Sequence, residues 1–288
     1  MTYSFTDGKG LLKLCGIYGS PISGIMLLSE AERSERSTDS ILAELEESLS
    51  VMERSIERGF DKTDPPHGVF VGGDAAKMLD YAAESWMGAD MAETVAAAIS
   101  VVEVNASMGR IVAAPTAGAS GILPAVLLTC GRKRGFDTAC LCRGLLTAGA
   151  VGIVIAKNAS IAGASGGCQA ETGSAAAMAA AALTELSGGT PEQALNAAAI
   201  ALKNIMGLVC DPVGGLVECP CVKRNAIGAV NAVLACDMTM AGIESLIPFD
   251  EVVEAMRRVG DMMHSDLKET ARGGLADTAT GRTLAQKI

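Results

Sequence analysis

Aromatic residues and histidines are scarce in this sequence. Among 288 residues there are five Phe, three Tyr, one Trp and two His. So few aromatic side chains argue against a platform on which nucleic-acid bases stack. The two histidines, and the lack of a G-x-S-x-G motif at a strand-to-helix elbow, argue against a Ser-His-Asp hydrolase.

Basic residues are also fewer than acidic ones. The 23 Lys and Arg face 33 Asp and Glu, which gives a formal net charge of −10. General binding to nucleic acids or anionic membranes depends on clustered Lys and Arg, so the composition disfavours both. The chain is 49% hydrophobic and 19% charged, which excludes a disordered polypeptide. It is rich in alanine and has 33 glycines, so its helices can pack closely.

We expect neither secretion of this chain nor its insertion into a membrane. The N-terminal residues MTYSFTDGKG contain no basic region followed by an apolar one. The longest apolar stretch, residues 145–156, ends at Lys157 and is shorter than the roughly 20 residues of a membrane span. We therefore expect a buried core helix there. Nine cysteines without a signal peptide are typical of a reducing compartment, and we expect a cytoplasmic protein.

Helical periodicity dominates the chain. Ile41, Leu45, Leu49 and Met52 recur at helical spacing and predict one long amphipathic helix over residues 29–59. Thr190 as N-cap and Pro191 at the first helical position mark another start. The further helices are expected over residues 74–85, 92–106, 121–132, 136–156, 171–186, 191–208, 224–240 and 249–263.

Strand-like alternation is rare, and residues 68–72 are the best short candidate. We therefore predict an all-α fold: one multi-helix globular domain over residues 1–288. The charged first helix differs in composition from the rest, so we expect an N-terminal helical appendage over about residues 1–66.

Three loops rich in small residues each precede an apolar helix. They cover residues 114–121, 158–168 and 210–215. A helix N-terminus exposes N–H groups that bind carboxylates and other anions. In a single loop the glycines more often serve only a tight turn. Three such loops, two of them with cysteine, favour a binding site.

The cysteines fall into different settings. Three lie among apolar residues and are expected to be small buried side chains: Cys15, Cys130 and Cys236. Three others lie beside Gly or Pro at loop–helix boundaries, where exposed N–H groups lower a thiol pKa: Cys168, Cys210 and Cys221. Their spacing matches no standard zinc-finger or ferredoxin signature, so the residues alone leave a shared metal site open.

Two charged residues near these loops are ambiguous. Lys157 closes an apolar helix, where a lysine commonly extends its charge into solvent. It could alternatively be a desolvated base or a partner for a substrate carboxylate. Glu171 has a similar ambiguity, because the first turn of any helix favours an acidic residue.

Seven blocks of sequence together resemble the α chain of iron–sulfur-dependent L-serine dehydratases. They occur in order over nearly the whole chain: residues 72–75, 108–121, 157–160, 167–171, 210–215, 220–226 and 269–276. The resemblance implies an all-α catalytic unit that converts L-serine to pyruvate and ammonia. Two alternatives stay open: a related cluster lyase acting on threonine or cysteine, and a non-catalytic cluster-binding subunit.

The resemblance also implies a cofactor. It is a [4Fe–4S] cluster held by three cysteines, and the matching positions are Cys168, Cys210 and Cys221. Cys219 is the second choice for the third ligand. Three thiolates leave one iron without a protein ligand, and that iron is a Lewis acid for the 3-hydroxyl of serine.

One branch of the family fuses this unit to a β domain with a Ser-His-Thr-type motif. The motif is absent here, so we expect a separate β subunit. That branch also has a C-terminal cysteine that can occupy the fourth iron. The present sequence ends without one, so we expect that iron to be open.

The resemblance further suggests where the substrate binds. The candidates for contacts to its carboxylate and amine are Thr116, Ala117, Gly118 and Ser120, together with Ser160, which is also a candidate catalytic residue. Lys157 is a candidate for the catalytic base or for an electrostatic partner. The base could instead come from the β subunit.

Overall fold

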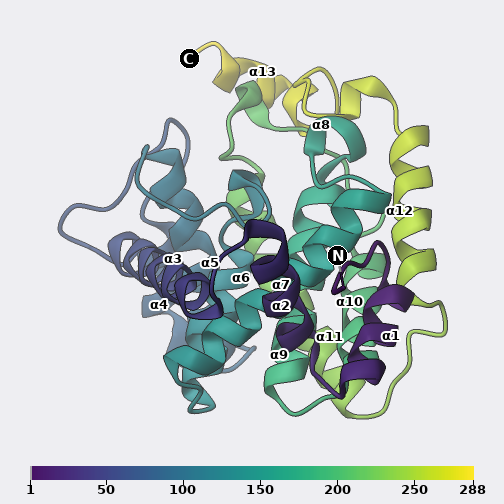
Figure 1. Cartoon of the computed structure of the whole chain (residues 1–288). Helices are drawn as coiled ribbons and strands as arrows, with labels where there is room; N and C mark the ends of the chain where they lie inside the picture. Colours follow the sequence, from purple (N-terminus) through teal and green to yellow (C-terminus); the bar gives the residue numbers. More distant parts are fainter. Residues whose placement is uncertain (1) are drawn as a thin grey trace.

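A computed structural model describes residues 2–288 and contains only helices and loops over that range (Figure 1). This confirms the predicted all-α fold. Residues 68–72 form no strand; an isolated bridge joins His67 to Gly72 instead. The helices are α1 (Gly8–Tyr18), α2 (Ile22–Ser34), α3 (Thr38–Gly59), α4 (Asp74–Asp80), α5 (Ala89–Ala106), α6 (Ile122–Ala125), α7 (Thr138–Asn158), α8 (Gly163–Gly166), α9 (Ser174–Leu186), α10 (Pro191–Asn204), α11 (Cys221–Met240), α12 (Phe249–Met262) and α13 (Ala279–Ala285).

The centre of the protein is the alanine-rich helix α9. Every residue from Ser174 to Thr184 is buried, and the helix packs against α7, α10 and α11. Small side chains permit this close packing. At Gly228 of α11, for example, a Cβ would lie 2.4 Å from the side chain of Ile122. The core is therefore built by close helix approach more than by large side chains.

Helix α7 contains the apolar stretch that the sequence placed in the core. By length and composition it could cross a membrane, but 61% of its most apolar window is buried inside the protein. It packs against α2 and α9. The consecutive helices α1 and α2 meet the same test only as a pair bent by 97°. These contacts agree with a core helix at residues 145–156.

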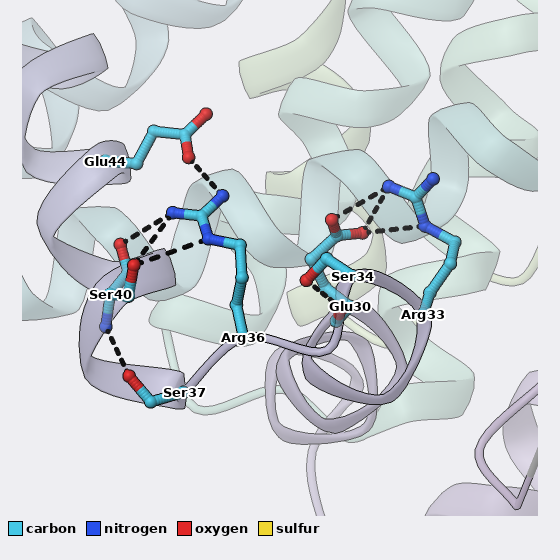
Figure 2. A network of polar contacts seen from close by, with 7 residues as sticks. All are labelled: Glu30, Arg33, Ser34, Arg36, Ser37, Ser40 and Glu44. Atoms are coloured by element: carbon cyan, nitrogen blue, oxygen red, sulfur yellow. Dashed lines mark hydrogen bonds and ion pairs between the residues drawn. The ribbon is translucent and has the colours of Figure 1, made fainter.

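The prediction of one continuous helix over residues 29–59 is wrong, because two helices occupy this region. Glu35 adopts a left-handed conformation (φ 55°) and ends α2. Ser37 then accepts a hydrogen bond from the Ser40 N–H (3.2 Å) and caps α3. Arg36 donates hydrogen bonds to the Ser40 hydroxyl and to Glu44, and these bonds connect the end of α2 to the start of α3 (Figure 2). A local cap therefore overrides the continuous apolar spacing.

The N-terminal helices share the main hydrophobic core. Leu11, Ile25 and Met52 are buried in the same cluster as residues of α7 and α9. The carboxylate of Glu185, at the end of α9, accepts hydrogen bonds from the N–H groups of Ile22 and Ser23. The division into a domain and an appendage at about residue 66 stays a prediction.

Other predicted helices agree with the structure apart from their ends. Thr190 and Gln193 form a capping box, with Pro191 at the start of α10. The segment 74–85 divides into α4 and a short 3₁₀ turn. Two segments contain π-helical turns, Val126–Gly131 and Gln169–Gly173. Such turns are frequent at functional sites, and the second one directly follows Cys168.

Candidate metal centre

Three side chains from two separate segments of the chain converge, with Cys168 and Glu171 on one segment and Cys210 on the other. A ligand atom from each of Cys168, Glu171 and Cys210 lies within 4.8 Å of the other two. Cys168 directly precedes the π turn that carries Glu171, and Cys210 lies in the loop between α10 and α11. Each cysteine is only 3% exposed. The group could hold a metal ion.

Cys221 is the first residue of α11 and is 7% exposed. It lies outside the group defined by the 4.8 Å distances. It is nevertheless close enough to be affected electrostatically, because burial and the charges of Cys168 and Glu171 raise its thiol pKa to about 12. The structure thus brings two of the three predicted ligands together with the third nearby. Cys219, the second choice, is half-buried.

The pKa values of the two converging thiols are shifted in opposite directions. The neighbouring Cys210 thiol lowers the pKa of Cys168, and Thr172 and Arg224 lower it further. The same contact, with burial, raises the pKa of Cys210. The first proton therefore leaves Cys168, which supplies a soft anionic ligand.

Glu171 links the cysteines to the loop of residues 114–121. Its Oε1 atom accepts a hydrogen bond from the Thr116 hydroxyl at 2.7 Å, and its Oε2 atom lies 3.9 Å from the Cys210 sulfur. Burial raises the pKa of Glu171 to about 7, and nearby negative charge on Cys168 and Glu269 acts in the same direction. The sequence left this residue ambiguous because its long-range partners could not be inferred from the helix-start position.

Glycines allow the loops to approach this carboxyl group. A Cβ on Gly163 would lie 2.7 Å from Glu171 Oε2 and 2.8 Å from the Cys210 sulfur. A Cβ on Gly118 would lie 3.2 Å from Glu171 Oε1. Gly163 in particular has no room for a larger residue.

Asn225 fixes the loop of residues 114–121 relative to Cys221. Its amide donates to the carbonyl groups of Gly118 (2.7 Å) and Cys221 (2.9 Å), and its Oδ1 atom accepts from the Gly121 N–H (2.9 Å). The loop and one predicted ligand are therefore held by a single buried side chain.

The predicted substrate-contact residues have different surroundings. Thr116 and Gly118 border Glu171, and Ala117 is half-buried in the same turn. Ser120 is fully buried and donates to the carbonyl of Ala117 (2.8 Å). Its hydroxyl therefore supports the turn, and the substrate-binding assignments themselves stay predictions.

Arg224 and Asp211 form an ion pair that the sequence analysis did not identify. Arg224 donates to Asp211 (2.8 Å) and to the carbonyl of Val209 (2.8 Å). The other carboxylate oxygen of Asp211 accepts from the N–H of Leu275 (2.7 Å). The pair joins α11, the Cys210 loop and the C-terminal segment. Its only sequence signal was its place one to three residues from Cys210 and Cys221.

Residues 264–274, which we call the strap, return to the same loop. The Cys210 N–H donates to the carbonyl of Leu267 (2.8 Å), and the Glu269 N–H donates to the carbonyl of Cys210 (2.7 Å). The strap therefore has a fixed position beside a predicted metal ligand.

The two residues predicted to be catalytic make other contacts. The exposed Lys157 donates to the carbonyl of Phe5 (2.8 Å) and lies 5.9 Å from the centre of its ring. Ser160 accepts a hydrogen bond from the Ala162 N–H (3.0 Å) and lines a cavity of about 280 Å³. None of these contacts is with Cys168, Glu171 or Cys210, so both catalytic assignments stay predictions.

Known proteins are similar to this chain over nearly its whole length. The family model described as serine dehydratase alpha chain matches residues 18–276. The chain is 50% identical to the probable L-serine dehydratase, alpha chain, of Bacillus subtilis (strain 168), covering 99% of this chain and 95% of that protein. It is 46% identical to the L-serine dehydratase, alpha chain, of Peptoniphilus asaccharolyticus, covering 96% and 95%. It is also 43% identical to the L-serine dehydratase of Streptomyces coelicolor, covering 96% of this chain and 61% of that protein.

Proposed function

The chain belongs to the serine dehydratase alpha chain family, and on that premise we propose that it dehydrates and deaminates L-serine with an iron–sulfur cluster. L-serine loses its Cα proton and its 3-hydroxyl group as water. The resulting aminoacrylate tautomerises to an imine, and hydrolysis of the imine gives pyruvate and ammonia.

The cluster would be held by Cys168, Cys210 and Cys221. The observation that carries this assignment is the convergence of Cys168 and Cys210, which lie in separate loops yet place their buried sulfurs within 4.8 Å. Thiolates are the ligands that iron–sulfur clusters require, so the donor set fits. When bound through three cysteines, a [4Fe–4S] cluster supplies an iron without a protein ligand, which acts as a Lewis acid on the 3-hydroxyl.

The surrounding residues bind and orient the substrate in this proposal. The turn of Thr116 to Ser120 presents small residues and backbone groups to a substrate carboxylate. The neighbouring Glu171, with its pKa raised to about 7, holds a proton more readily and so repels that carboxylate less. Thr116 orients the Glu171 carboxyl group, while Asn225 fixes the turn against Cys221. Arg224 and Asp211 keep the Cys210 loop in place.

We further propose that a separate β subunit associates with this chain. Its relatives of similar length are α chains, of which it covers 95%. It covers only 61% of the longer L-serine dehydratase of Streptomyces coelicolor. The remaining part of the enzyme would then be supplied by the partner.

The test is pyruvate release from L-serine under anaerobic conditions, with and without the β subunit. We expect activity that survives without added pyridoxal phosphate. Exposure to air should abolish it, and ferrous iron with thiol should restore it, because an iron that lacks a protein ligand is readily lost on oxidation. Full activity in air without iron would overturn the proposal.

A further inference from the structure

Glu269 has an unusual position on the strap. Its N–H donates to the carbonyl of Cys210 at 2.7 Å, and the Cys210 N–H donates to the carbonyl of Leu267 at 2.8 Å. These two hydrogen bonds place residues 267 to 269 directly beside a predicted cluster ligand. The backbone of Glu269 is therefore joined directly to that of Cys210.

The backbone at Glu269 is one that glutamate does not favour. Its φ is +62°, and Ala271, two residues later, has a φ of +54°. In this left-handed region a Cβ meets its own backbone, so Gly or Asn would fit with less strain. Strained conformations of this kind persist at functional sites, where the surrounding structure imposes them. A glutamate thus stands at a position whose backbone favours glycine or asparagine.

The carboxylate of Glu269 also has no partner among residues 2–288: it makes no hydrogen bond or ion pair there. The side chain is exposed. The residue nevertheless lies beside the site, because its own N–H donates to the Cys210 carbonyl (2.7 Å), and its negative charge acts on the Glu171 carboxyl group. The nearby guanidinium of Arg224 is already paired with Asp211. No ion pair within residues 2–288 therefore neutralises Glu269.

L-serine offers three groups to its binding site: a carboxylate, a hydroxyl and an ammonium. In the proposed function the turn of Thr116 to Ser120 receives the carboxylate and the cluster receives the hydroxyl. The ammonium group can only donate hydrogen bonds, and a carboxylate is its strongest acceptor. We propose that Glu269 binds the α-ammonium group of L-serine as a specificity-determining residue. This inference rests on the proposed function.

The test compares Glu269→Gln with the wild-type chain, each assembled with the β subunit and prepared anaerobically. We expect the KM for L-serine to rise on the order of 10-fold, because a charge-assisted hydrogen bond is lost. Inhibition by 3-hydroxypropionate, which is L-serine without its ammonium group, should keep the same inhibition constant. The iron content should be unchanged. Asp266→Asn removes a negative charge from the same strap, where Asp266 faces His264 at 3.4 Å, and should leave the KM unchanged.

A second variant separates binding from a structural role. Glu269→Gly suits the left-handed backbone, so it should not lower the melting temperature, yet it should raise the KM as Glu269→Gln does. Three results would overturn the inference: an unchanged KM in both variants, iron loss in Glu269→Gln, or an equal weakening of 3-hydroxypropionate. An inactive or iron-free wild-type enzyme would instead refute the proposed function.

Discussion

The alanine-rich core and the cysteine-bearing loops are built in different ways. In the core, α9 buries eleven consecutive residues, Ser174 to Thr184, whose backbone polar groups are paired within helices. Around the cysteines the backbone follows short turns, and side chains such as Asn225 and Asp211 bind its N–H and carbonyl groups. Packing of small side chains thus makes the scaffold, and polar side chains position the site.

The cysteines of the core also differ from those of the site. Cys15 and Cys142 lie within helices, and burial raises each thiol pKa to about 11, so both stay neutral packing residues. Cys168 is just as buried, yet the Cys210 thiol and Arg224 lower its pKa. Burial alone therefore does not decide what a cysteine does; its hydrogen-bond donors do.

The largest expected effect is the loss of the site cysteines. Cys168→Ser, Cys210→Ser and Cys221→Ser should each abolish iron binding and serine dehydration, because serine is a poorly ionised, harder ligand. Cys15→Ser, Cys130→Ser and Cys236→Ser are the matched controls and should keep wild-type iron content with a modest loss of stability. Iron and pyruvate assays on anaerobic preparations measure this. Equal iron loss in all six variants would remove the distinction between the two groups.

A methyl group added beside the cysteines should come next. In Gly163→Ala the new Cβ would fall within 3 Å of Glu171 and the Cys210 sulfur, so we expect iron content and activity to fall several-fold. Gly149→Ala in α7 meets nothing within 4 Å and should raise the free energy of unfolding by up to about 1 kcal/mol. Wild-type iron content in Gly163→Ala would contradict the close approach of α8 to the site.

Overpacking of the core should reduce stability without changing the chemistry. Ala179 of α9 is fully buried, so Ala179→Leu should lower the free energy of unfolding by about 1–3 kcal/mol. The folded fraction should bind iron as the wild type does. Urea unfolding and the iron content per folded chain are the measurements. A loss of iron with unchanged stability would contradict this separation of the core from the site.

The smallest effect concerns Glu103 of α5, which is fully buried and accepts hydrogen bonds from the N–H groups of Asp74 (2.8 Å) and Ala75 (3.2 Å). Burial raises its pKa above the ordinary 4.5. The folded state then holds the proton more tightly than the unfolded chain, so this contribution to stability is present at low pH and is lost as pH rises above about 4.5. As the pH rises from 4 to 7, the urea concentration at the midpoint of unfolding should fall less steeply in Glu103→Gln than in the wild type. Parallel slopes would contradict the raised pKa.

Much of the scaffold could be predicted from the sequence because local signals determine it. The Thr190 and Pro191 start of α10 and the apolar spacing in α3 and α12 are examples. The break at Glu35 was missed, because its cause is a cap at Ser37 inside a continuous charged segment. Local propensity and periodicity do not reveal which of two competing local structures prevails.

The site could be predicted only in part. The position of Cys168, Cys210 and Cys221 beside Gly or Pro made them candidates, and the family resemblance assigned them as cluster ligands; Cys168 and Cys210 converge in the structure. Glu171 and Arg224 depend on partners that lie far away in sequence or in other loops, such as Thr116 and Asp211. For Lys157, whose position beside a loop suggested chemistry, the contacts are with Phe5, and its catalytic role stays a prediction.

The central claim is that the cysteine-bearing loops, and not the packed core, hold the catalytic cluster. The most direct measurement is the iron and inorganic sulfide bound by the chain when it is isolated without oxygen. We predict about four of each per chain, as a [4Fe–4S] cluster requires, in a preparation that releases pyruvate from L-serine. A chain that contains no iron and still releases pyruvate from L-serine at the same rate would contradict the account.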